Sequence, residues 1–125
     1  ASTPSVSSFT TSALLFGFGT FQLGLALGAP WGRAAYGGQH AGTVPRELRT
    51  VSAVATIVYA ATAYTIASPR TSQRLRRGAL TVVAAFMAVG TPLHLVSRST
   101  LERALWVPAC VTTGMVAWKA RNLAT

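Results

Sequence analysis

The sequence predicts an all-α fold, a four-helix transmembrane bundle, formed by a single membrane domain over residues 1–125. Half of the residues are hydrophobic and only 10% are charged, whereas a soluble domain is about 25% charged. Four apolar stretches divide the chain, and most of the charged residues lie between them or near the C-terminus. So few charges cannot cover a water-facing surface, so we expect hydrocarbon to surround most of the chain.

The four apolar stretches are each long enough to cross a bilayer. They cover residues 9–29, 48–68, 78–96 and 101–118, and a crossing needs about 20 residues. Buried helices of a soluble protein could look similar, but four in succession without an amphipathic pattern favour lipid. We expect helices because backbone groups cannot remain unpaired in hydrocarbon.

The first stretch carries small residues on one helical stripe. Gly24 and Gly28 form a GxxxG pair, preceded on the same stripe by Gly17 and Phe21. Such a pair lets helices approach closely, either within the chain or across a dimer. Gln22, near the middle of this stretch, predicts either a hydrogen bond between helices or a contact with a ligand.

The three connections differ in length and charge. The first, residues 30–47, is long and glycine-rich; the second, 69–77, is short and holds four arginines; the third, 97–100, is a tight turn. With four crossings, both termini and the second connection share one side. The arginine cluster indicates that this side is cytoplasmic, so we expect a multi-pass protein of the inner (plasma) membrane with both termini in the cytoplasm.

Two features mark the end where the third and fourth stretches meet. Pro92 and Pro108 remove helical hydrogen bonds and should kink or loosen their helices. Ser99 and Glu102 have the spacing of a capping box, which predicts that Glu102 supports the start of the last helix.

The first and third connections should share one membrane face, and this juxtaposition predicts a ligand-binding pocket. Both histidines and both carboxylates of the chain lie in or near these connections. The candidate ligand-binding residues are Gln22, Trp31, Arg33, Tyr36, His40, His94, Glu102, Arg103 and Trp106. Each also has an ordinary role: His94 could bond a neighbouring helix, and Arg33 could reach a lipid phosphate.

The residue inventory limits the chemistry. The chain has no Asp, so a Ser-His-Asp triad is excluded, and its one cysteine, Cys110, excludes a cysteine metal cluster. We predict no metal site and assign no catalytic residue, and the sequence names no cofactor. If the protein is an enzyme, Glu102 and His94 would transfer protons. The net charge of +9 does not indicate nucleic-acid binding, because no basic helix accompanies it.

Two segments carry a resemblance to a known family. The first runs Gly28-Ala29-Pro30-Trp31-Gly32, and the second runs from Ser97 to Pro108 with the pattern SxSxxERxLWxP. The layout resembles a family of small, mostly uncharacterised bacterial integral membrane proteins with four spans. The resemblance implies the four-span fold and a bacterial source, and no established activity. Members of that family often have an amide where His94 stands, which argues against a catalytic histidine.

The expected function is that of a non-enzymatic membrane component. We expect either an accessory subunit of a larger membrane complex or a binder of a lipophilic ligand, with membrane lipid and other membrane subunits or a second copy as partners. The alternative is a membrane-embedded enzyme acting on an isoprenoid or quinone-like substrate. A third reading, a small transporter, normally needs an ionisable residue within the membrane, and the first stretch offers only Gln22.

Overall fold

The computed structural model describes residues 3–40, 42–97 and 99–124, and over these residues the chain is helical without strands. It contains four α-helices and two short 3₁₀ turns. These are α1 (Val6–Ala26), η1 (Gly32–Ala34), η2 (Tyr36–Gly38), α2 (Arg46–Ala67), α3 (Gln73–Leu95) and α4 (Thr100–Leu123). The predicted helical class is therefore confirmed.

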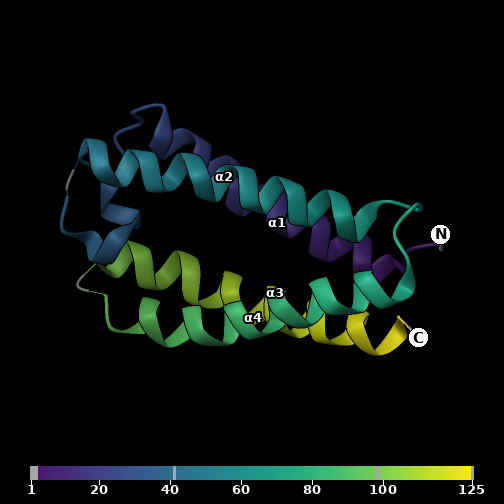
Figure 1. The fold of residues 1–125 in the computed structure, drawn as a ribbon. Helices are drawn as coiled ribbons and strands as arrows, with labels where there is room; N and C mark the ends of the chain where they lie inside the picture. The colour runs from purple at the N-terminus through teal and green to yellow at the C-terminus, as the bar shows by residue number, and fades with distance from the viewer. Residues whose placement is uncertain (1–2, 41, 98, 125) are drawn as a thin grey trace.

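The four helices form two antiparallel pairs (Figure 1). Helix α1 packs along α2, and α3 packs along α4; α1 also contacts α4, whereas α2 and α3 touch over a short stretch only. Both termini and the α2–α3 connection lie at one end of the bundle. The first connection and the α3–α4 turn lie together at the other end, as the predicted topology requires.

Three of the four helices are long and apolar enough to cross a membrane. These are α1, α2 and α3, whose most apolar windows have mean hydropathies of 1.2, 1.5 and 1.6. Helix α4 falls outside this group, and it carries Glu102 and Arg103 near its start and Lys119 and Arg121 near its end. The chain is thus a helical protein with three candidate membrane-spanning helices, and a fourth crossing stays a proposal.

The helix boundaries differ by five residues from the predicted ones at two places: α4 ends at Leu123 rather than at residue 118, and α3 starts earlier than predicted. This helix begins at Gln73 rather than at residue 78, because the Ser72 hydroxyl caps it by accepting a hydrogen bond from the Leu75 amide at 3.2 Å. Most of the arginine cluster assigned to the second connection therefore belongs to a helix. Helices α3 and α4 both continue through their prolines, Pro92 and Pro108.

The main apolar core lies where the two helix pairs meet. Its largest buried side chains come from all four helices and include Leu15, Phe18, Ile66, Leu80, Met87 and Trp106. Within the first pair, the Ser12 hydroxyl donates a 2.6 Å hydrogen bond to the Ala63 carbonyl.

A buried arginine closes the connection between α2 and α3. Arg76 is only 1% exposed. Its guanidinium donates to the carbonyls of Ile66 at 3.0 Å, Ser68 at 2.7 Å and Thr71 at 3.3 Å, and to the side chain of Gln73 at 2.9 Å. The last carbonyls of a helix have no partner within the helix, so Arg76 supplies the donors that the end of α2 lacks.

Arginine side chains also bond backbone carbonyls in the other two connections. Arg49, near the start of α2, donates to the Ala26 carbonyl at the end of α1 at 3.2 Å. Arg103, near the start of α4, donates to the Ser97 carbonyl just beyond α3. Arg49 therefore stabilises the end of α1 as Arg76 does that of α2, whereas Arg103 holds the turn that follows α3.

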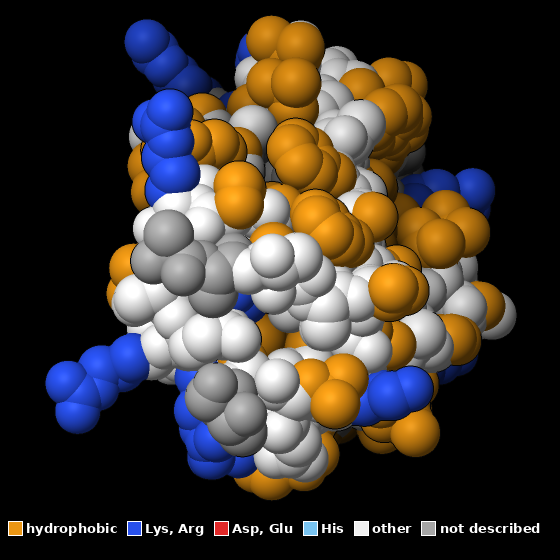
Figure 2. Space-filling view, turned by 90° about the vertical axis from the view of Figure 1, so that its right-hand side faces the viewer, with side chains coloured by type: hydrophobic (Ala, Val, Ile, Leu, Met, Phe, Trp, Pro, Cys, Tyr) orange, Lys and Arg blue, Asp and Glu red, His pale blue; other side chains and the backbone are white. Residues whose placement is uncertain are grey.

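The end of the bundle that holds both termini is surrounded by cations. Figure 2 views this end and shows Lys and Arg side chains projecting around its edge, between apolar side chains, with no Asp or Glu in view. The cations near this end, besides buried Arg76, are Arg70, Arg74, Arg77, Lys119 and Arg121.

Candidate functional site

The first connection is folded tightly against the opposite end of the bundle. The amide of Gly32 donates to the Gly42 carbonyl at 2.8 Å, and a Cβ added at Gly32 would lie 2.0 Å from the carbonyl oxygen of His40. Gly38 has a φ of +72°, and a Cβ there would lie 2.4 Å from the Cβ of Ser99. Glycine is therefore required where the connection closes on itself and where it meets the start of α4.

Tyr36 is held in an unusual backbone conformation within this connection. Its φ is 50°, in the left-handed region that non-glycine residues rarely adopt. Its hydroxyl lies 2.6 Å from the hydroxyl of Ser52 and donates to the Leu48 carbonyl at 3.2 Å. Such strain costs about 1–3 kcal/mol and persists only where surrounding contacts enforce it; here those contacts fix the ring beside the bundle interior.

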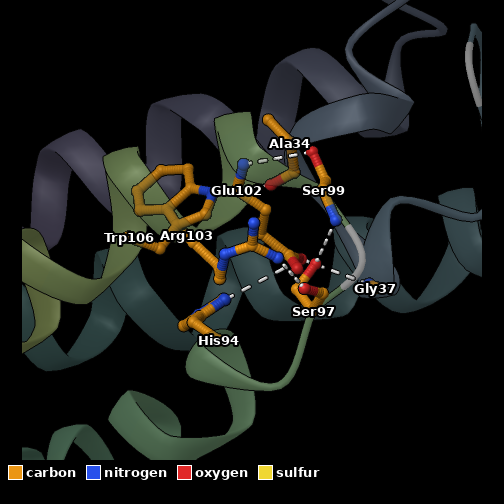
Figure 3. Close-up of polar contacts among 8 residues, drawn as sticks. All are labelled: Ala34, Gly37, His94, Ser97, Ser99, Glu102, Arg103 and Trp106. Atoms are coloured by element: carbon orange, nitrogen blue, oxygen red, sulfur yellow. Dashed lines mark hydrogen bonds and ion pairs between the residues drawn. The ribbon is translucent and has the colours of Figure 1, made fainter.

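Glu102 lies in the interior, although a water-exposed position would cost its carboxylate less. Its side chain is 3% exposed, and its Oε1 lies 3.8 Å from Nδ1 of His94. The Gly37 amide donates to the same oxygen at 3.2 Å. Figure 3 shows these contacts, which join α3, α4 and the first connection.

Only one of the two hydrogen bonds of the predicted capping box forms at the start of α4. The Ser99 hydroxyl accepts from the Glu102 amide at 3.2 Å, as predicted. The second bond of a capping box would run from the Ser99 amide to the Glu102 carboxylate. Here the Ser99 amide donates instead to the Ser97 hydroxyl at 3.1 Å. The carboxylate of Glu102 is thereby released from capping and turns toward Gly37 and His94 (Figure 3).

Trp106 forms a wall of the same region, one helical turn beyond Glu102. Its indole N–H donates to the Ala34 carbonyl at 2.6 Å, which anchors α4 to the first connection. Its ring stacks on Phe18 at 5.2 Å between centroids and meets Phe21 edge-on at 4.7 Å.

These groups line an internal pocket of about 290 Å³. Its polar and charged lining residues are Gln22, Tyr36, Tyr59, His94 and Glu102, and much of the remaining wall is aromatic. The oxygen Oε1 of Gln22 is buried and has no hydrogen-bond partner among the described residues. Buried polar atoms are nearly always bonded, but protein atoms enclose this oxygen, so a group in the pocket would reach it only if the Gln22 side chain turned.

An almost wholly apolar groove lies between α2 and α3 and adjoins the pocket. It has a volume of about 400 Å³, and its rim includes Val51, Val54 and Val58 of α2 and Val82 of α3. Five residues line both spaces: Gln22, Tyr36, Tyr59, Phe86 and Met87. The groove follows from the short contact between α2 and α3, and it leads from the outer faces of these helices toward Glu102.

A larger hollow lies elsewhere. It has a volume of about 610 Å³ and runs over α3 and α4 beside Met115 and Trp118. It is broad and nearly all apolar, and neither His94 nor Glu102 lines it. Ligand sites combine an apolar wall with a few converging polar groups, so the smaller pocket is the better candidate.

The structure gathers five of the nine predicted site residues around this pocket. These are Gln22, Tyr36, His94, Glu102 and Trp106. Whether they bind a ligand stays a prediction, but their convergence from the two predicted connections and from α1 agrees with the expected juxtaposition.

The other four predicted residues lie outside the pocket lining. Trp31 stacks on Phe21 at 5.7 Å and covers Gly24. Arg33 lies at the surface beside the start of α4, and Arg103 donates to the Ser97 carbonyl and to the Thr100 hydroxyl. The backbone carbonyl of His40 packs closely against Gly32 within the first connection.

Several pocket residues were not predicted. They are mainly the aromatic residues Phe18, Phe21, Tyr59 and Phe86. In the sequence they look like ordinary apolar positions of membrane helices. A spacing of three places Phe18 and Phe21 on one face of α1 beside Gln22, which was the available signal.

The described residues contain no group of three or more His, Cys, Asp or Glu side chains that could hold a metal ion. Searches of protein families, of curated proteins and of solved structures found no match to this chain.

Proposed function

We propose that this protein binds a lipophilic molecule with a polar head in the internal pocket, and that the molecule arrives sideways from the bilayer between α2 and α3. The observation that carries the proposal is a pocket lined by polar groups, His94 and Glu102 among them, that adjoins an apolar groove. A polar head would meet those groups, and an apolar tail would fill the groove.

Size and chemistry support this arrangement. Small-molecule sites measure about 300–1,000 Å³ and are mostly apolar with a few placed polar groups. The pocket of about 290 Å³ and the adjoining groove of about 400 Å³ together fall in that range. The groove faces outward between two helices that are apolar enough to lie in lipid, so a membrane-dissolved molecule could reach the pocket without crossing water.

A substitution that fills the groove tests the proposal. Ala55 lines the groove on α2, and Ala55→Trp should occupy much of it. Ala60→Trp is the matched control, because Ala60 lies on the same helix, is exposed and is absent from the groove lining. Each variant is purified in a mild detergent, its organic extract is analysed by mass spectrometry, and its helix content is checked by circular dichroism.

We expect one lipophilic species to be retained by the wild type and by Ala60→Trp, and to be lost from Ala55→Trp. Equal amounts in all three proteins, or no species beyond bulk lipid in the wild type, would contradict the proposal.

One further contact supports the enzymatic alternative, catalysis on an isoprenoid or quinone-like substrate. His94 Nδ1 and Glu102 Oε1 are 3.8 Å apart at the pocket, and such a pair can relay a proton. An activity found with such substrates should be lost in both Glu102→Gln and His94→Ala. Retention of the activity in both variants would end this alternative.

The number of membrane crossings and their orientation are also proposals. We propose four crossings with both termini in the cytoplasm, supported by the common end of the termini and the cations around it. The accessory-subunit and transporter readings stay predictions, and copurification with a partner or flux in liposomes would test them.

A further inference from the structure

We infer that the head group taken by this pocket is cationic, so that the ligand is a lipophilic ammonium compound. This inference rests on the proposed function and adds the charge of the ligand. It follows from two features of the pocket: a buried carboxylate with a weak basic partner, and a wall of aromatic rings.

The carboxylate of Glu102 has little positive charge beside it. Among the described residues, His94 is the one basic side chain within ion-pair distance of it. Arg103, the next residue in the chain, donates to the Ser97 carbonyl instead. Over the part of the chain that the structure describes, this buried acid therefore has no arginine in ion-pair contact, although the net charge is +9.

A buried carboxylate without a close cation is costly. The Gly37 amide compensates Glu102 in part, but a neutral donor does not balance a full charge. A ligand cation in the pocket would do so, in a region where low polarity strengthens the attraction between opposite charges.

The aromatic wall suits the same kind of ligand. Ring contacts run without interruption from Phe86 to Tyr59 at 6.5 Å, to Phe18 at 5.6 Å, to Trp106 at 5.2 Å and to Phe21 at 4.7 Å. All five rings line the pocket. Aromatic faces attract ammonium groups, and sites for quaternary ammonium ligands are lined by such rings.

A neutral alcohol in the pocket would leave the charge of Glu102 uncompensated, whereas an ammonium group would balance it. The pocket should therefore prefer an amine to an alcohol of the same length.

The experiment compares two probes that differ in charge alone. Tritiated dodecylamine, which is protonated at neutral pH, and tritiated dodecanol are bound at equilibrium to the protein in phosphatidylcholine nanodiscs, with empty nanodiscs as the partition blank. Glu102→Gln removes the charge at constant size. Glu47→Gln is the matched control, because it removes the other carboxylate of the chain, which is exposed at the start of α2.

We expect the wild type to bind the amine at least about tenfold more tightly than the alcohol, and Glu102→Gln to weaken amine binding by about thirtyfold. Glu47→Gln should bind both probes as the wild type does. The comparison of the two probes on the wild type stands even if Glu102→Gln does not fold.

Two results separate the inference from the function on which it rests. Equal binding of amine and alcohol, or an unchanged affinity in a folded Glu102→Gln, would overturn the inference and leave a binder of neutral lipophiles. Binding of neither probe above the blank would count against both.

Discussion

Arg76→Met should destabilise the protein far more than any other single change to its arginines outside the pocket end. Methionine retains most of the apolar stem of Arg76 but removes the guanidinium, which bonds the carbonyls of Ile66, Ser68 and Thr71 inside the protein. The effect therefore reports hydrogen bonding rather than packing.

The magnitude follows from the carbonyls left behind. A buried polar group that loses its partner costs about 1–3 kcal/mol, so three of them could cost up to about 9 kcal/mol. The site lies at a helix end, where water can reach part of the exposed backbone. We therefore expect a loss of about 3–5 kcal/mol, the range found when one member of a buried charged contact is removed.

The assay is equilibrium unfolding in mixed micelles of a mild detergent and SDS, followed by circular dichroism. Arg74→Met is the control, since Arg74 is exposed two residues earlier in the same helix, and it should stay within about 0.5 kcal/mol of the wild type. Arg76→Lys should recover little, because an ammonium cannot reproduce the fork of donors. A loss below about 1 kcal/mol in Arg76→Met would refute the role of Arg76 as the cap of α2.

The same unfolding assay tests two packing contacts. A Cβ at Gly24 would lie 2.0 Å from the Trp31 ring, so Gly24→Ala should cost about 1–3 kcal/mol; Gly17→Ala, with nothing within 4 Å of the new atom, should be neutral or stabilising, and the reverse order would contradict the placement of Trp31. Ser12→Ala should cost about 0.5–1.5 kcal/mol through the lost bond to Ala63, and no loss would show that this bond adds nothing.

The helical class and the order of the elements could be predicted because they depend on the solvent. Long apolar stretches with charges between them have one stable form in hydrocarbon, and the four helices lie where the stretches predict. The start of α3 was predicted less well because hydropathy misses a polar first turn. That turn is helical because Ser72 caps it and because Arg76 finds its partners in the preceding helix end.

The sequence predicted which residues of the candidate site share one end of the bundle, but it did not predict which side chains contact one another. Topology alone predicts that the first connection meets the α3–α4 turn, and this placed Tyr36, His94 and Glu102 in one region. It could not predict that Glu102 leaves its capping role, because that depends on a competing bond between Ser97 and Ser99. Nor could it separate Trp31, which covers a glycine, from Trp106, which lines the pocket.

The arginines that close the three connections also bear on how the chain is made. Each belongs to the helix that follows, so for α1 and α2 the carbonyls at the helix end receive the donors of Arg49 and Arg76 only after the next segment has been synthesised. Assembly then has a built-in direction from the N-terminus to the C-terminus. In a chain that ends just before Arg49 or Arg76, the last carbonyls of the preceding helix lack this donor. A chain a few residues longer supplies it.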